Sequence, residues 1–278
     1  MNNRIVKKSS LAPNVTRFEL DAPAIANKHK AGQFVIIRHA ENGERIPLTI
    51  ADSDPVAGTI SIISQSVGKS TKALAEFEPG DILLDVAGPL GSPTHIDQFG
   101  TVVCIGGGIG AAPLYPITKA LHYAGNKIVS ILGARSGNMF ILKEEMDALS
   151  DQLILTTDDG SDGQKGFVTD ALTELIEKGT HIDLVIAIGP TIMMKMVAEK
   201  TRAYKISTVA SLNTIMVDGT GMCGGCRVTV GGETKFVCVD GPEFDAHQVD
   251  WNEMLNRLHS YHDHECQALR QIERTEND

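Results

Sequence analysis

Residues 1–98 alternate between short apolar runs and turn residues. Gly, Pro, Asp or Asn bound each run, as in NVTRFELDAP, GQFVIIRHA, RIPLTIADSD, GTISIISQSVG and GDILLDVAGPLG. Short strands with turn signals about every ten residues are typical of antiparallel barrels and sandwiches. We therefore predict an antiparallel β-barrel over residues 1–98.

From residue 99 the pattern changes to strands that alternate with helices. The apolar runs TVVCIGGG, KIVSILGAR, QLILTTDDG and DLVIAIGP are separated by the helical segments AAPLYPITKALHYAG, KEEMDALS and TDALTELIEKG, and IMMKMVAEKTRAY follows the last. This alternation predicts a doubly wound parallel sheet over residues 99–210. We expect Cys104 in the core of its strand and Met196 in the core-facing side of the last helix.

The chain after residue 242 is predicted to be a helical tail, residues 243–278, behind a turn-rich start. Apolar residues recur at helical spacing from residue 251 to about 272: Trp251, Met254, Leu255, Leu258, Tyr261, Ala268 and Leu269. His259, His262 and His264 are interpreted as a solvated helix face, because no Cys or carboxylate cluster is spaced to complete a metal site with them.

Composition and charge limit the kinds of partner that this chain can bind and the cellular compartment that suits it. The net charge of −10 argues against nucleic acid or an anionic membrane as the partner. No apolar run reaches the roughly 18 residues that span a bilayer, and MNNRIVKKSS lacks the apolar region of a secretory signal. Five cysteines, three of them clustered, indicate a reducing compartment, for which the cytoplasm is the default.

Three of those cysteines lie within residues 211–242, which we predict to be an iron–sulfur subdomain. Asp218, Cys223, Cys226 and Cys238 read Asp-x4-Cys-x2-Cys-x11-Cys. The plant-type 2Fe–2S pattern is Cys-x4-Cys-x2-Cys with a fourth Cys further on, so aspartate occupies the first ligand position. Carboxylate is a harder ligand than thiolate but can bind iron. A zinc knuckle and a redox Cys-x-x-Cys are the alternatives, although zinc sites usually have two ligand pairs.

Two stretches of the predicted barrel carry candidate chemistry. Arg45-Ile46-Pro47-Leu48-Thr49 opens a strand, and Gly68-Lys69-Ser70-Thr71 precedes a helical segment. A glycine, a cation and hydroxyls at a helix start can cradle phosphate, although the Walker pattern GxxxxGK[ST] is absent. Taken alone, the second stretch is slightly better interpreted as an ordinary capped helix.

The predicted parallel sheet has a glycine turn directly after its first strand, GGGIGAAP over residues 106–113. Glycines there let a pyrophosphate approach a helix N-terminus, and the strand-then-helix context favours a nucleotide over a generic turn. TDDGSDG over residues 157–163 and Gly189-Pro190 follow later strands, at the edge where such sheets bind ligands. Asp158 and Asp159 would repel a 2′-phosphate, and Arg135 is the one nearby arginine, so we expect NADH rather than NADPH.

These motifs together resemble the ferredoxin reductase family with a C-terminal 2Fe–2S site. The resemblance implies that Thr49 faces flavin N5, that Pro47 and Leu48 line the ring and that Arg45 reaches the phosphates. It implies the FAD contacts Arg45, Pro47, Leu48, Thr49, Ile63, Gly68, Lys69, Ser70 and Thr71. It implies the NAD contacts Gly107, Gly108, Ile109, Gly110, Ala111, Pro113, Ala134, Arg135, Asp158, Asp159, Gly160, Gly189, Pro190 and Met193. It implies that the metal ligands are Asp218, Cys223, Cys226 and Cys238.

Two electron-transfer families within that superfamily are similar to this chain. The dihydroorotate dehydrogenase electron-transfer subunit carries four cysteines at its cluster. The small subunit of NADH-dependent reduced ferredoxin:NADP+ oxidoreductase has aspartate first, an RIPLTIAD strand and a helical tail after FDAHQVDW, as here. Asp218 therefore favours the second family.

That resemblance implies an electron relay between NAD(H), FAD and the cluster. It also implies a heterodimer with a larger subunit that carries FAD and 4Fe–4S clusters, binds NADPH and meets ferredoxin, the whole being electron-bifurcating. An oxygenase or flavin reductase component is an alternative from the same superfamily. A zinc-stabilised nucleotide-binding scaffold without flavin is an alternative from another class.

Overall fold

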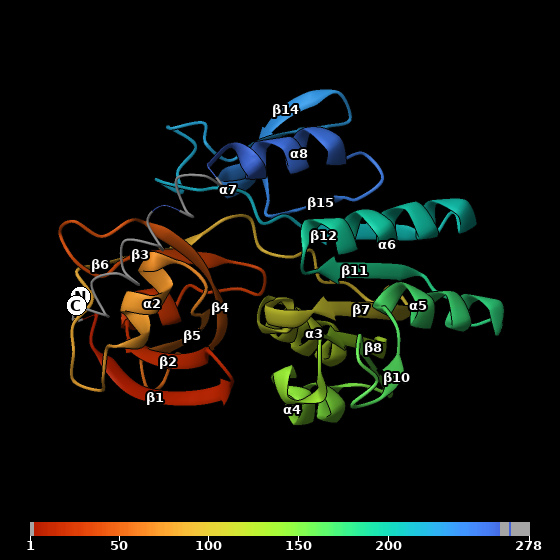
Figure 1. Cartoon of the computed structure of the whole chain (residues 1–278), viewed down its shortest axis with the longest axis horizontal. Helices are drawn as coiled ribbons and strands as arrows, with labels where there is room; N and C mark the ends of the chain where they lie inside the picture. Colours follow the sequence, from red (N-terminus) through yellow and green to blue (C-terminus); the bar gives the residue numbers. More distant parts are fainter. Residues whose placement is uncertain (1–2, 262–266, 268–278) are drawn as a thin grey trace.

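The N-terminal strands form one six-stranded antiparallel sheet with the order β1-β2-β5-β4-β3-β6, seen at the left of Figure 1. A bridge between Arg4 and Ile82 joins the start of β1 to the segment before β6. The sheet therefore closes into a barrel, as predicted. The computed structural model describes residues 3–261 and 267. The strands are β1 (Ile5–Ala12), β2 (Val15–Asp21), β3 (Phe34–Arg38), β4 (Ile46–Asp54), β5 (Thr59–Gln65) and β6 (Asp85–Leu90).

Alternate residues of these strands fill the barrel. Phe18 and Leu20 of β2, with Ile60 and Ile62 of β5, are fully buried in one cluster. The two-residue repeat of a strand puts such residues on one face, and each buried side chain stabilises the fold by about 1.5–3 kcal/mol. The apolar alternation therefore fixes which face of each strand points inward.

The second sheet has seven strands in the order β10-β9-β8-β7-β11-β12-β15, seen at the right of Figure 1. All pairs are parallel except β12 with β15. The first strand, β7, lies at the centre, with β8 on one side and β11 on the other, which makes the point between β7 and β11 the topological switch. The strands are β7 (Thr101–Gly107), β8 (Lys127–Ala134), β9 (Gln152–Thr157), β10 (Gln164–Lys165), β11 (Leu184–Ile188), β12 (Ser207–Ser211) and β15 (Glu243–Asp245).

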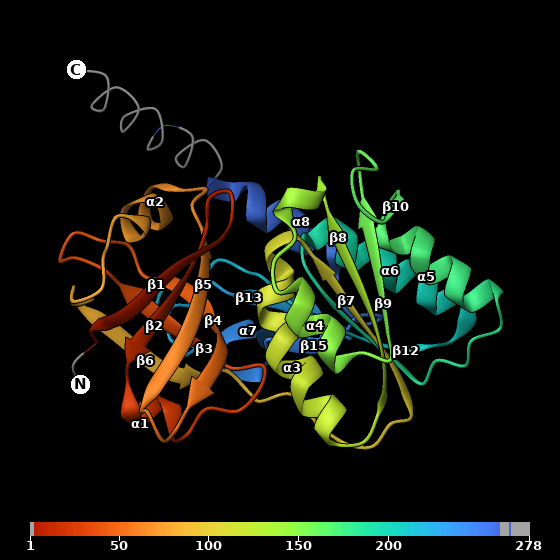
Figure 2. The same ribbon diagram turned by 90° about the horizontal axis from the view of Figure 1, so that it is seen from below.

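Helices cover both faces of this sheet (Figure 2). Val102 and Cys104 of β7 belong to a core cluster with α3 and α4, whereas Val103 and Ile105 belong to one with α5 and α6. Burial on both faces explains the continuous apolar strands. The helices are α1 (Pro23–Ala26), α2 (Lys69–Ala75), α3 (Ala111–Tyr123), α4 (Lys143–Leu149), α5 (Val168–Glu177), α6 (Thr191–Tyr204), α7 (Val237–Asp240) and α8 (Trp251–Leu258), with 3-10 turns η1 (Gly108–Gly110), η2 (Gly137–Met139) and η3 (His259–Tyr261).

The cysteine-rich segment packs where the two sheets meet, at the top of Figure 1. It contains the hairpin β13 (Arg227–Val230) and β14 (Glu233–Phe236), followed by α7. The amide of Ser92 donates to the carbonyl of Gly241 over 2.7 Å, and the amide of Leu212 donates to that of Pro242 over 2.9 Å. The segment is thus tied to the linker after the barrel and to the end of β12.

Three expectations about individual segments have clear outcomes. Cys104 is fully buried, as predicted. The prediction for Met196 is wrong: its side chain is 46% exposed, and Met194 and Val197 of the same helix point into the core instead. In the predicted tail, residues 243–245 form a sheet strand, and the helix from Trp251 continues as a 3-10 turn to residue 261. Residues 262–266 and 268–278, which include His262, His264, Ala268 and Leu269, lie outside the described part of the chain. No helix in the described part is long and apolar enough to cross a bilayer.

Candidate functional site

The predicted cluster ligands lie in two close pairs. Cys223 Sγ is 3.3 Å from Asp218 Oδ1, and Cys226 Sγ is 3.2 Å from Cys238 Sγ. Cys223 is exposed, whereas Cys226 and Cys238 are buried and all three are free thiols. The sequence thus folds so that the first two positions of the motif form one pair and the last two form the other.

Glycines give the loop its tight course. Gly219, Gly221 and Gly224 have φ of 75°, 84° and 66°, which non-glycine residues rarely adopt. The amide of Gly225 points at Cys223 Sγ over 3.4 Å, and that of Cys238 points at Cys226 Sγ over 3.4 Å. Amide groups aimed at ligand sulfurs are the contacts that tune an iron–sulfur centre.

Asp218 is held as a carboxylate. Partial burial opposes its ionisation, but hydrogen bonds from Thr220 and Cys223 outweigh burial and lower the pKa of Asp218 to about 2. Its Oδ2 accepts the amides of Met222 and Cys223, each over 3.0 Å, which leaves Oδ1 as the oxygen nearer the Cys223 sulfur. An ionised oxygen beside a thiol is the donor set that a shared iron requires.

This arrangement fits a two-iron cluster rather than a single zinc ion. Within residues 3–261 and 267, no group of three or more His, Cys, Asp or Glu side chains is placed to hold one metal ion. Structural zinc needs four ligands around one point, whereas each iron of a 2Fe–2S cluster takes two protein ligands. Two separate ligand pairs on one glycine-rich loop match the second requirement.

The predicted flavin contacts gather on β4, β5 and the start of α2. Pro47, Leu48 and Thr49 are half-buried on β4, and Arg45 is exposed just before it. Thr49 Oγ1 has no hydrogen-bond partner among the described side chains and backbone groups, so it can bond a ligand. Ile63 of β5 is buried against the second sheet's helices.

Two buried hydroxyls near α2 indicate whether the predicted flavin site can accept a polar ligand. Ser64 Oγ on β5 is buried without a hydrogen-bond partner in the described chain, as expected beside a site for a polar molecule. Ser70 is also buried and donates to Glu44, while the amide of Gly68 donates to Thr71 Oγ1 over 3.0 Å. Of the predicted phosphate contacts, Lys69 is exposed, as Arg45 is, whereas Gly68 and Thr71 are half-buried. The hydroxyls of Ser64, Ser70 and Thr71 are the kind of group that can hydrogen-bond the phosphates and ribityl chain of FAD.

The predicted nucleotide contacts meet at the switch point between β7 and β11. A Cβ at Gly107 would lie 2.5 Å from Met193 Sδ, and one at Gly110 would lie 2.3 Å from the carbonyl oxygen of Ile188. A Cβ at Gly189 would lie 2.9 Å from Met193 Cε. The ends of β7 and β11 can therefore approach this closely only because glycines without side chains lie between them. Gly108, at φ 54°, faces open space. Ile109 lies in η1, Ala111 and Pro113 lie in the first turn of α3, and Pro190 immediately precedes α6.

A shallow depression lies further along the same edge, between the ends of β8 and β9. The amides of Asp158 and Asp159 bond the carbonyls of Ala134 and Arg135 over 3.1 and 3.3 Å, which brings these predicted contacts together with Gly160. The depression is lined by Ser136, Gly137, Asn138, Asp159, Ser161 and Asp162. Gly137 and Asn138 carry no sequence motif and were not expected; their position in η2, just after β8, is the signal that could have identified them.

Charge in this depression is predominantly negative. Asp159 accepts the Ser161 hydroxyl over 2.6 Å, and hydrogen bonds from Ser161 lower its pKa. Asp162 is paired with Lys143 over 2.8 Å. Carboxylates accept hydrogen bonds from ribose hydroxyls and repel an added phosphate, so this lining suits NAD(H).

Strand β4, which carries the predicted flavin contacts and is called the flavin strand below, lies between the other two candidate sites. On one side it pairs with β3, where Phe34 lies opposite Thr49. A Cβ at Gly219 of the cluster loop would lie 2.8 Å from side-chain carbons of Ile36 in β3 and Leu90 in β6. On the other side, β4 contacts α3, the helix that follows the nucleotide turn. The three candidate sites therefore form a series, with the flavin strand in the middle.

Two family models match parts of the chain. The iron–sulfur cluster binding domain of dihydroorotate dehydrogenase B matches residues 213–250, and the oxidoreductase NAD-binding domain matches residues 104–199. Each covers the segment in which the corresponding ligands were predicted.

Full-length similarity is also high. A Thermotoga maritima protein, a dihydroorotate dehydrogenase B (NAD(+)) electron transfer subunit homolog, is 50% identical over 263 residues, 95% of this chain and 93% of that protein. The dihydroorotate dehydrogenase B (NAD(+)) electron transfer subunit of Geobacillus thermodenitrificans is 35% identical over 88% of this chain and 96% of its own. A chain from the structure of the NADH-dependent reduced ferredoxin-NADP oxidoreductase, described for flavin-based electron bifurcation, has a TM-score of 0.92, 48% identity and 98% coverage of both chains.

Proposed function

This chain belongs to the family of dihydroorotate dehydrogenase B electron-transfer subunits and their homologues, and we propose that it serves an electron-bifurcating NADH-dependent reduced ferredoxin:NADP+ oxidoreductase. Membership makes it an oxidoreductase subunit that uses NAD(H), FAD and an iron–sulfur cluster and works with a larger catalytic subunit. When bound, flavin exchanges electrons with a nicotinamide in pairs, and a 2Fe–2S cluster carries them singly.

The observation that carries the bifurcating assignment is the pairing of Asp218 with Cys223. By the family resemblance of its sequence motifs, aspartate in the first ligand position distinguishes the bifurcating family from the four-cysteine electron-transfer subunits. The 3.3 Å approach of Asp218 Oδ1 to the Cys223 sulfur supports a ligand role. The match over 98% of the bifurcating oxidoreductase chain is independent support.

We assign the following roles to this chain's own residues. Thr49 offers its hydroxyl to the reacting edge of the flavin, with Pro47 and Leu48 along the ring. Arg45 and the turn at residues 68–71 hold the FAD phosphates, and Ile63 packs at the barrel side of the site. The turns at residues 107–113 and 189–193 hold the nicotinamide nucleotide, and residues 134–135 and 158–160 hold its outer ribose. Asp218, Cys223, Cys226 and Cys238 hold the cluster.

The order of the three sites sets the route of the electrons. Because β4 contacts α3 on one side and pairs with β3 on the other, a flavin held along β4 would lie between the nucleotide turn and the cluster loop, and the nucleotide and the cluster would not need to contact each other. We further propose a heterodimer with a larger FAD and 4Fe–4S subunit that meets ferredoxin, and a cytoplasmic location, where thiol ligands stay reduced.

The test is the activity of the purified complex under anaerobic conditions. In a bifurcating complex, oxidation of NADPH requires NAD+ and oxidised ferredoxin together, and the two acceptors are reduced in equal numbers of electrons. NADPH oxidation with either acceptor alone would contradict the assignment.

A second function is favoured by the 50% identity to the Thermotoga maritima homolog of a dihydroorotate dehydrogenase subunit. In that case the partner oxidises dihydroorotate and this chain passes the electrons to NAD+. Dihydroorotate-dependent reduction of NAD+ by the complex, without any requirement for ferredoxin, would establish this alternative.

A further inference from the structure

A β-bulge turns one charged residue of the flavin strand toward the nucleotide-binding helix. In the β4–β5 pair, Ile50 lies opposite Ile62 and Asp52 lies opposite Ser61, so Ala51 is an extra residue. Ile50 points into the barrel core, whereas Ala51 is buried against α3. Strict alternation would return Asp52 to the barrel side, but the extra residue at a bulge re-aims the side chain that follows it.

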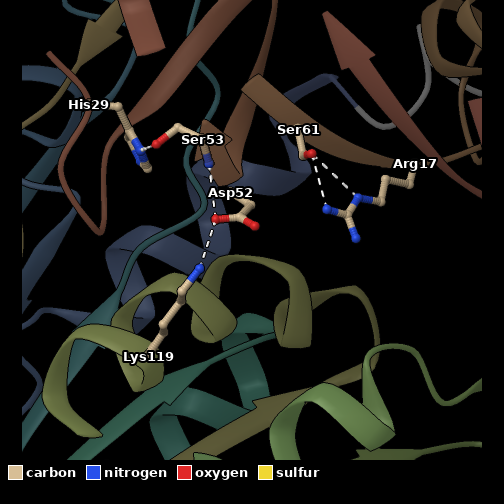
Figure 3. Close-up of polar contacts among 6 residues, drawn as sticks. All are labelled: Arg17, His29, Asp52, Ser53, Ser61 and Lys119. Atoms are coloured by element: carbon tan, nitrogen blue, oxygen red, sulfur yellow. Dashed lines mark hydrogen bonds and ion pairs between the residues drawn. The ribbon is translucent and has the colours of Figure 1, made fainter. Parts of the chain in front are cut away.

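The re-aimed carboxylate meets a lysine of α3 (Figure 3). Lys119 Nζ donates to Asp52 Oδ1 over 3.2 Å. The amide of Ser53 donates to the same oxygen over 3.0 Å, and the Ser53 hydroxyl lies 2.9 Å from His29 Nδ1. The Asp52 carboxylate is therefore oriented by its own strand as well as by its contact with α3.

Lys119 is also held in place from its own side. Its ammonium lies 5.8 Å from the ring centroid of Tyr115, one turn earlier on α3, at a distance that allows a cation–π contact. Both partners of the ion pair are only about one-third exposed, at 38% for Lys119 and 34% for Asp52. A charge pair with fixed partners and limited water access has a defined geometry rather than a diffuse attraction.

Within the described residues, this is the one ion pair that joins the barrel to the domain of the second sheet. Three of the other pairs lie within the barrel and four within the second sheet and its helices, and the pair of Lys235 with Glu233 lies within β14. It connects two functional segments directly. Asp52 follows Thr49 by three residues on the flavin strand, and α3 begins at Ala111, immediately after the glycine turn η1. Any rotation of α3 relative to β4 would move the nucleotide turn relative to Thr49.

We propose that Asp52 and Lys119 form a positioning contact that holds the nicotinamide nucleotide in alignment with the flavin for hydride transfer. The pair touches neither reacting atom; it fixes the relation between the two segments that do. Hydride transfer requires donor and acceptor atoms about 3–3.5 Å apart, and misplacement of a reactant lowers the rate steeply. This inference rests on the proposed electron relay, because it needs NAD(H) and FAD in their assigned sites.

The expected effect is modest, because partly exposed ion pairs bias an equilibrium only weakly. Loss of the pair should lower the population of the aligned arrangement, and hence the hydride-transfer rate, by about two- to fivefold. The loss should be greatest at low ionic strength, where such pairs are least screened.

The experiment follows reduction of bound FAD by saturating NADH in the cofactor-loaded protein by anaerobic stopped flow. The variants are Asp52→Asn, Lys119→Met, the double variant Asp52→Asn/Lys119→Met and the exchanged pair Asp52→Lys/Lys119→Asp. The matched control is Asp85→Asn, which breaks an ion pair with Arg38 that lies within the barrel. Two further readouts report alignment rather than folding: the isotope effect with 4-deuterated NADH and the charge-transfer absorbance between nicotinamide and flavin.

If the inference holds, each single variant reduces FAD about two- to fivefold more slowly, with a larger isotope effect and weaker charge-transfer absorbance. The double variant is then no slower than the singles, the exchanged pair recovers part of the rate, and Asp85→Asn matches wild type. Single variants with wild-type rates and absorbance, or losses that multiply in the double variant, would overturn it. Variants that lose bound flavin and are less thermally stable, but keep the wild-type isotope effect, would show that the contact is purely structural and would also overturn the inference. Wild-type FAD that NADH does not reduce would instead overturn the proposed relay itself.

Discussion

Replacement of Glu243 by glutamine should change how the stability of this protein depends on pH. Glu243 begins β15 and accepts the Thr94 hydroxyl over 2.6 Å, across the junction between the barrel linker and the edge of the second sheet. A Cβ at Gly32 of the barrel would lie 3.0 Å from the same carboxylate oxygen, Oε1. Burial between these elements raises the pKa of Glu243 to about 7, against the opposing effect of the Thr94 hydrogen bond.

The sign and size of the effect follow from proton linkage. In the unfolded chain this carboxyl loses its proton near pH 4.5, whereas in the folded protein it keeps the proton up to about pH 7. Between these values the folded state binds more protons, so the free energy of unfolding falls as pH rises through this window. The difference amounts to about 3 kcal/mol, fully present below pH 4.5 and lost above pH 7.

The assay compares urea unfolding of wild type and Glu243→Gln at pH 5 and pH 8, both with cofactors bound. Glutamine keeps an oxygen for the Thr94 hydroxyl but has no proton to lose. The variant should therefore gain on wild type by up to about 3 kcal/mol between the two pH values. Glu199→Gln removes an exposed carboxylate and serves as the control, with no such gain. Identical pH dependence in wild type and Glu243→Gln would refute the reasoning.

Three further changes have distinct expected results. Asp218→Ala should lower bound iron from about two per chain to less than one while Asp218→Cys retains it, as measured by iron and labile-sulfide analysis; full iron in the alanine variant would remove Asp218 from the ligand set. Gly110→Ala places a Cβ 2.3 Å from the Ile188 carbonyl oxygen and should weaken NADH binding at least about tenfold by calorimetry, with flavin content unchanged. Met194→Lys should destabilise the fold by more than about 3 kcal/mol in urea unfolding, whereas Met196→Lys should stay within about 0.5 kcal/mol, because only Met194 is buried.

Local patterns in the sequence were sufficient to predict both sheets. The two-residue alternation of the barrel strands and the strand–helix alternation after residue 99 each reflect burial that every segment arranges independently. The cluster motif was equally local, since Asp218, Cys223 and Cys226 lie within nine residues and close on themselves through glycine.

Met196 shows a local signal that was misinterpreted. Successive helical residues turn by about 100°, so residues two apart lie on nearly opposite faces. With Met194, Val197 and Ala198 buried, Met196 must point outward. The two-residue spacing of the methionines in IMMKM indicates that Met196 faces away from Met194. The prediction relied instead on the hydrophobic character of methionine.

Contacts between distant segments could not be predicted. Asp52 and Lys119 are 67 residues apart, and their contact depends on a bulge that places Ala51 out of register with β5. Thr94 and Glu243 are 149 residues apart and meet only because β15 adds to β12. Such pairs depend on tertiary geometry, which has no periodic trace in the sequence.

The most direct test of the electron relay is an anaerobic titration of the purified protein with NADH, followed by flavin absorbance and by electron paramagnetic resonance. If the nucleotide, flavin and cluster sites form a working series, NADH bleaches one FAD per chain, and the signal of a reduced 2Fe–2S cluster appears as the flavin is reduced. A protein whose flavin is bleached without any cluster signal at excess NADH, or that shows neither change, would contradict the account.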